Sequence, residues 1–189
     1  LDAQLHLPAG YSISYGGAYS EQQQSFRELM MILSLAVLLV FAVLMFLFRE
    51  WRISLTVLFI SVLGICGCLL ALWLTGVPLN VSSYTGIIMV VGIIAENAIF
   101  TVWQYRMNRR TGGDVSEAVD YAIALRIRPK LMTAIGAVLA LMPLALGIGL
   151  GAQMQQPLAV AVIGGFIVGL PLLLLVLPSI MLLIYKKSK

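Results

Sequence analysis

The sequence contains little charge and few residues that suit an aqueous surface. Only 11% of its 189 residues are Asp, Glu, Lys or Arg, whereas a soluble domain has about 25%. The hydrophobic fraction is 61% and the mean hydropathy is +1.01, well above the roughly 45–50% apolar content of soluble domains. These values exclude an ordinary soluble domain, and we expect an all-α membrane protein.

Residues that form disulfides, metal sites or active sites are equally scarce. Cys66 and Cys68 lie within an apolar run, and the single histidine, His6, has no ligand residues beside it. Neither a disulfide framework nor a metal site is therefore expected. No glycine-rich phosphate loop and no nucleophile–base pair stands out. We predict a protein that is not an enzyme and that binds no metal or organic cofactor.

Five apolar runs are long enough to cross a membrane as helices. A bilayer core of about 30 Å needs about 20 helical residues, and Glu96 is the only charged residue in all five runs. The fold class is thus a five-helix transmembrane bundle, which we assign to residues 26–189. The predicted spans cover approximately residues 29–48, 53–74, 81–105, 131–150 and 157–185.

Basic residues gather at one end of the predicted bundle. Eleven of the twelve lysines and arginines follow the first, third or fifth span, and only Arg27 lies at the other end. Because lysine and arginine are enriched in cytoplasmic loops, the N-terminus is predicted outside the cytoplasm and the C-terminus inside it. The formal net charge of +4 then reflects membrane orientation, and we expect no nucleic-acid binding.

Two polar segments are placed outside the membrane. Residues 1–25 alternate weakly in "YSIS" between prolines and glycines, which predicts a short extracytoplasmic α/β remnant. Because so short a strand is unstable alone, we expect the chain to be part of a longer protein. Residues 114–127 pair Asp114 with Glu117 in a capping-box-like pattern ahead of an apolar stripe, which predicts an amphipathic connector on the cytoplasmic surface.

The stretch "GIIAENAIF", residues 92–100, places a carboxylate in the third span. A charged side chain at the centre of a bilayer costs roughly 2.5–3.5 kcal/mol or more. One interpretation of Glu96 is a neutral carboxyl group that holds helices together by hydrogen bonds. The interpretation we favour is a proton carrier, because intramembrane acids usually mark proton relays or ion pathways.

Polar residues that suit a relay lie near Glu96. Asn97 follows it directly, and the helical rise of about 1.5 Å per residue brings Thr133 and the long side chain of Lys130 within its reach. An ordinary snorkelling anchor is the alternative for Lys130. A hydrogen bond to its own backbone is the alternative for Thr133.

Small residues predict where the helices pack closely. Gly92 lies four residues before Glu96 on the same helical face, and Gly136 lies in the fourth span. Gly165 and Gly169 form a G-x-x-x-G pair in the fifth span. Such glycines specify close helix packing and say nothing about a substrate.

Four ordered motifs resemble the C-terminal half of a resistance-nodulation-division (RND) efflux permease, over essentially the whole chain. They are "LPAGYSISYGG", "VGIIAENAIF", "RIRPKLMTAIGAVLALMPLALG" and "QQPLAVAVIGGFIVGLPLLLLVLPSIMLLIY". The resemblance implies that the five spans are the last five of twelve, and that residues 1–25 end a periplasmic domain. It also implies a proton-driven exporter of drugs, metal ions or other small molecules in the bacterial inner membrane.

The resemblance further implies a set of relay residues and partners. Glu96, Asn97, Lys130 and Thr133 match relay positions, together with acids of the family's fourth helix, which this chain lacks. Drug exporters usually have lysine where Glu96 stands. Glu96 with Lys130 looks like some heavy-metal exporters, whereas Asn97 matches the drug branch, so both substrate classes stay open.

The implied energy source is the proton gradient, without a cofactor. The implied partners are the N-terminal half of the same permease, two further copies in a homotrimer, membrane lipid, a periplasmic adaptor and an outer-membrane channel. Two alternatives to an exporter stay open. One is a structural membrane module in which Glu96 is a static hydrogen-bond node. The other is a protein-export auxiliary of the same superfamily.

Overall fold

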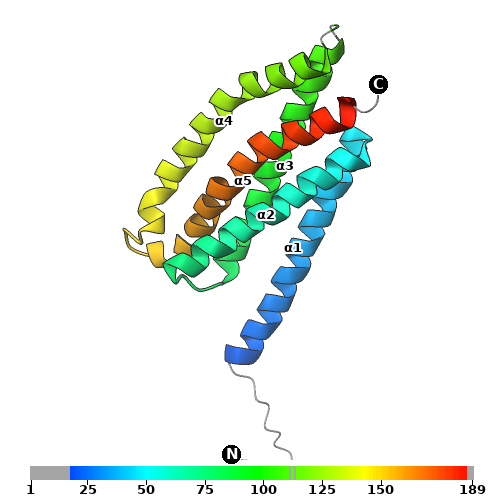
Figure 1. The fold of residues 1–189 in the computed structure, drawn as a ribbon. Coiled ribbons are helices and arrows are strands. Elements are labelled where there is room, and N and C mark those ends of the chain that lie inside the picture. Colours follow the sequence, from blue (N-terminus) through cyan, green and yellow to red (C-terminus); the bar gives the residue numbers. More distant parts are fainter. Residues whose placement is uncertain (1–17, 111, 113, 187–189) are drawn as a thin grey trace, which may run out of the picture.

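The structure is a bundle of five long α-helices (Figure 1). It is a computed structural model that describes residues 18–110, 112 and 114–186, except the side chains of residues 18–22 and 186. Every helix has a stretch long and apolar enough to cross a membrane, which confirms the predicted all-α bundle. The helices are α1 (Ala18–Phe48), α2 (Trp51–Thr75), α3 (Val81–Arg110), α4 (Val115–Ala145) and α5 (Ala152–Lys186).

The predicted α/β remnant has no counterpart in the described part of the chain, which contains no strand. Residues 18–25 of the predicted remnant are the first turns of α1, and residues 1–17 lie outside the described residues. Most of α1 is exposed, and its buried residues, Leu44 and Phe48, lie at its C-terminal end. Figure 1 shows α1 diverging from the other helices toward its N-terminal end.

The core of the bundle is formed by α2, α3 and α5, and α2 packs most extensively on α5. Glycines allow these helices to approach closely. A Cβ atom at Gly67 would lie 2.9 Å from the backbone oxygen of Gly164, and one at Gly169 would lie 3.7 Å from the Cα atom of Gly64. Small residues at helix crossings allow the backbones to approach each other closely. Helices α2 and α5 are therefore in close contact at these glycines.

Helix α4 combines two segments that the sequence suggested were separate. The connector of residues 114–127 and the fourth span form one helix, which bends as it passes along the outside of the bundle (Figure 1). Pro129 lies inside α4, where its missing N–H group leaves one backbone acceptor without its usual donor. Asp114 is the N-cap residue, as predicted, but its side chain makes no capping hydrogen bond.

Candidate functional site

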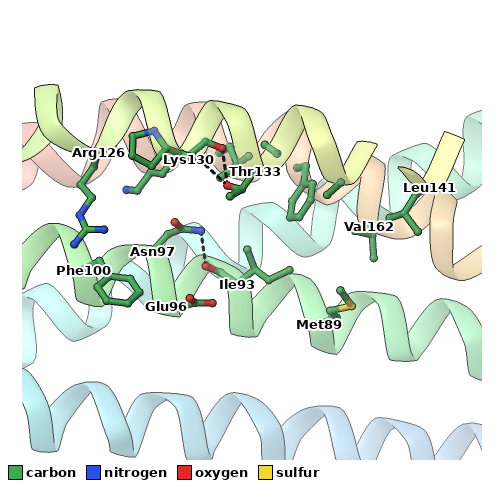
Figure 2. A pocket seen from close by; sticks show the side chains of 15 residues that line it. Met89, Ile93, Glu96, Asn97, Phe100, Arg126, Lys130, Thr133, Leu141 and Val162 are labelled. Carbon is green, nitrogen blue, oxygen red and sulfur yellow. Dashed lines mark hydrogen bonds between the residues drawn. The ribbon is translucent and has the colours of Figure 1, made fainter. Parts of the chain in front are cut away.

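A cavity of about 390 Å³ lies between α3, α4 and α5 (Figure 2). Its volume is within the range of about 300–1,000 Å³ that is typical of ligand sites. Both apolar and polar side chains form its wall. The polar lining residues are Glu96 and Asn97 from α3, and Arg126, Lys130 and Thr133 from α4. The structure therefore brings all four predicted relay residues to one cavity.

Lys130 is a buried cation in this cavity. Lys130 is only 5% exposed, and its Nζ atom donates a 2.7 Å hydrogen bond to Oγ1 of Thr101 on α3. Thr101 in turn donates from Oγ1 to the backbone oxygen of Asn97 at 2.9 Å. A lysine ammonium group has three donors, and among the described residues only this neutral hydroxyl is bonded to it. The charge is thus held in place but not neutralised.

Glu96 lines the same cavity from the α3 side. Its side chain is exposed, and among the described residues it makes no hydrogen bond and no ion pair. An ionised carboxylate in an apolar environment is costly unless it is paired. Glu96 and Lys130 are therefore an acid and a base on facing helices that do not bond to each other in this conformation.

The other two predicted residues make local hydrogen bonds. Nδ2 of Asn97 donates to the backbone oxygen of Ile93 at 2.9 Å, as the dashed line in Figure 2 marks. Oγ1 of Thr133 lies 3.0 Å from the backbone oxygens of both Pro129 and Lys130. Thr133 thus makes the bond to its own helix backbone that was the alternative to a relay contact. Both side chains nevertheless remain at the cavity wall.

Arg126 and Phe100 also line the cavity, although neither was predicted as a site residue. The guanidinium carbon of Arg126 lies 4.7 Å from the ring centroid of Phe100, which is a cation–π contact between α4 and α3. Figure 2 shows the Arg126 side chain extending from α4 toward α3. The missed signal is its spacing: Arg126 precedes Lys130 by four residues, which places both cations on one helical face.

The four glycines predicted at helix contacts occupy two kinds of surroundings. A Cβ atom at Gly165 would lie 2.6 Å from both Val90 methyl groups, and one at Gly169 would lie 2.8 Å from Cδ1 of Ile94. Gly92 and Gly136 have no atom within 4 Å of a built Cβ in the described part of the chain. Close packing at these last two positions stays a prediction.

Comparison with known proteins identifies relatives of the chain. A model of the AcrB/AcrD/AcrF family matches residues 1–185. The cobalt-zinc-cadmium resistance protein CzcA of Cupriavidus metallidurans is 34% identical over 189 residues, which are 100% of this chain and 18% of that protein. The multidrug resistance protein MdtC of Erwinia tasmaniensis is 36% identical over 181 residues, covering 94% of this chain and 18% of that protein.

The fold is also found in a solved structure. The X-ray crystal structure of a heavy metal efflux pump superposes with a TM-score of 0.78 at 36% sequence identity. The match covers 95% of this chain and 18% of that one. The chain therefore spans less than a fifth of the length of the relatives that it matches.

Proposed function

The chain belongs to the AcrB/AcrD/AcrF family, and on this basis we propose that it is the C-terminal membrane part of a proton-driven RND efflux permease. The resemblance noted in the sequence is thereby confirmed at the level of the family. The relatives named for resistance to cobalt, zinc and cadmium and the heavy metal efflux pump favour a metal ion as the exported substrate. Export of drugs is the second candidate, supported by the similarity to MdtC.

The observation that carries the proposal is the unpaired state of Glu96 across a shared cavity from the buried Lys130. In the conformation described, Lys130 is bonded to Thr101 at 2.7 Å. Among the described residues, no cation is paired with Glu96. We assign this conformation to the step in which Glu96 holds a proton.

Loss of that proton changes the balance of contacts. The carboxylate attracts the Lys130 ammonium group, which exchanges Thr101 for Glu96 as its partner and draws α4 toward α3. Two unit charges about 4 Å apart attract by about 4 kcal/mol at an effective dielectric constant of about 20. That free energy shifts a two-state equilibrium by roughly a thousandfold. Proton binding and release at Glu96 thus switch the packing of α4.

The remaining parts of the pump are proposed to lie outside this chain. The N-terminal half supplies further relay acids and most of the substrate-binding domain. The assembly is proposed to be a homotrimer in the bacterial inner membrane. The N-terminus of this chain is proposed to be periplasmic and its C-terminus cytoplasmic. A periplasmic adaptor and an outer-membrane channel complete the export route, and the proton gradient supplies the energy without a cofactor.

The competing hypothesis is a structural module in which Glu96 is a static hydrogen-bond node. Because Glu96 has no hydrogen-bond partner among the described residues, that role would require a partner from another part of the protein. A protein-export auxiliary of the same superfamily is less well supported, since the relatives named above are resistance proteins and an efflux pump.

The test is proton-coupled metal efflux by the full-length permease that contains this segment. Glu96→Gln keeps the shape of the side chain but cannot release a proton, so we expect efflux to be lost while trimer assembly is retained. Glu117→Gln is the matched control, because Glu117 is an exposed carboxylate at the start of α4. Retained coupling in Glu96→Gln would leave Glu96 with a structural role only.

A further inference from the structure

A second cavity, of about 320 Å³, lies where α1 joins α2 beside the C-terminal end of α5. Figure 1 shows these segments together at one end of the bundle. The cavity belongs neither to the site of Glu96 nor to any helix involved in the Lys130 hydrogen bond. Its lining residues are Arg49, Glu50, Trp51, Arg52, Ile184 and Tyr185.

The single carboxylate of this cavity is already engaged. Oε2 of Glu50 accepts a 2.7 Å hydrogen bond from the hydroxyl group of Tyr185, and Oε1 lies 3.4 Å from a guanidinium nitrogen of Arg106. Arg49 and Arg52 are exposed and form no ion pair among the described residues. The cavity therefore offers two cations that no anion among the described residues neutralises.

The local backbone adds donors to the same place. Arg49 adopts a left-handed conformation, with φ of 54°, which allows the chain to reverse within two residues. Glu50 is the N-cap of α2 but makes no capping bond with its side chain, so its carboxylate does not satisfy the first N–H groups of α2. Helix N-termini favour anions, and phosphate groups in particular.

The apolar surroundings indicate that the anion is attached to a lipid. Trp51, which is 59% exposed, lies beside the guanidinium group of Arg52, with 5.7 Å between the guanidinium carbon and the ring centroid. Arginine and tryptophan together are typical of the membrane–water boundary. Exposed Leu55 and Phe59 follow Trp51 at intervals of four residues, so an apolar stripe leads from the cavity along α2.

We propose that this cavity binds the headgroup phosphate of an anionic phospholipid, with an acyl chain lying along Trp51, Leu55 and Phe59. Arg49, Arg52 and the N-terminus of α2 contact the phosphate. The proposal rests on the proposed function only for the orientation, which places this end of the bundle in the cytoplasmic leaflet, where anionic lipids attract basic residues. Inorganic phosphate has the same chemistry as the headgroup phosphate, but it has no acyl chain to contact the apolar stripe.

The experiment measures binding of tail-labelled phosphatidylglycerol to the delipidated full-length permease in detergent. The test variant is Arg49→Asn with Arg52→Gln, because asparagine tolerates the left-handed backbone at position 49. The matched control is Arg110→Gln with Arg128→Gln, which removes two exposed cations outside the cavity. One basic residue near an anionic surface is worth about a fivefold change in affinity.

We expect the test variant to bind phosphatidylglycerol at least about fivefold more weakly, and the control variant to change less than about twofold. Wild type should bind phosphatidylethanolamine more weakly than phosphatidylglycerol, and millimolar inorganic phosphate should not displace the lipid. Equal losses in both variants, or equal binding of the two lipids, would overturn the proposal. Displacement by inorganic phosphate would reassign the cavity to the free anion and also overturn it.

A second measurement does not depend on these substitutions. Phosphatidylglycerol brominated near the headgroup should quench tryptophan fluorescence in wild type more than in Trp51→Phe, because Trp51 lines the cavity. Identical quenching in the two proteins would count against a lipid in this place. Efflux and the state of Glu96 do not enter either measurement, so failure of the relay proposal would not affect the result.

Discussion

The hydroxyl group of Tyr185 donates a 2.7 Å hydrogen bond to Oε2 of Glu50, although the two residues are 135 positions apart in the chain. Glu50 also contacts Arg106, whose guanidinium group donates to the backbone oxygens of Leu47 and Phe48. These contacts join the α1–α2 turn to the ends of α3 and α5. One glutamate thus links four of the five helices at the end predicted to be cytoplasmic.

Tyr185→Phe should lower the free energy of unfolding by about 1 kcal/mol, the usual contribution of a partly exposed hydrogen bond. The ring and its stacking on Tyr105, at 4.8 Å between centroids, are preserved, so only the hydroxyl group is tested. Unfolding of the full-length permease in a denaturing detergent measures the change. Tyr121→Phe is the control, because Tyr121 is exposed on α4; equal losses would deny the bond a stabilising role.

Gly165→Ala should destabilise the bundle by about 1–3 kcal/mol, as expected for overpacking. The added Cβ would lie 2.6 Å from two Val90 methyl groups and 2.8 Å from Sγ of Cys68. Gly136→Ala is the matched control, because its Cβ would meet no atom within 4 Å in the described part of the chain. If Gly136→Ala is equally destabilising in the full-length protein, another segment packs on α4 there.

Thr101→Val should reduce proton-coupled efflux by about tenfold or more, since a hydrogen bond to a charged group is worth about 1.5–3 kcal/mol. It removes the acceptor of Lys130 without changing the size of the side chain much. Thr85→Val is the control, because Thr85 is an exposed threonine of the same helix that bonds only its own backbone. Similar efflux in both variants would argue against exchange of Lys130 between two partners.

The predicted orientation is tested by cysteine labelling. In intact spheroplasts, a membrane-impermeant maleimide should label Pro78→Cys, in the turn between α2 and α3, but not Asp114→Cys, which lies before α4. Asp114→Cys should react only after permeabilisation. The parent protein, with Cys66 and Cys68 inside α2, gives the background. The reverse labelling pattern would contradict the orientation that the distribution of lysine and arginine predicts.

The helices were predictable because long apolar runs interrupted by short polar turns leave few alternatives. The third span, predicted to end at residue 105, continues in α3 to Arg110. The fall in hydropathy marks the membrane boundary, but polar residues can extend the helix beyond it into water. Pro129, which lies between the predicted connector and the predicted fourth span, does not interrupt α4. Proline suits a first turn, but it is also tolerated inside membrane helices where neighbours satisfy the freed backbone groups.

The members of the candidate site were easier to find than their contacts. The rarity of acids in membrane spans singled out Glu96, and helix geometry brought Lys130 and Thr133 near it. The bond between Lys130 and Thr101 depends on how α4 rotates against α3, which side-chain periodicity does not specify for a helix that is apolar on most sides. Arg126 was overlooked because its partner is an aromatic face, not a charge.

The 31 residues of α4 have a length of about 46 Å at a rise of about 1.5 Å per residue, whereas a hydrocarbon core is only about 30 Å thick. About 20 residues counted back from Ala145 fill that thickness, and they end at Arg126. Lys130 then lies about one helical turn inside the boundary. A bilayer thinner by one turn would expose its ammonium group to headgroup water, so we expect the lipid chain length to set the environment of this charge.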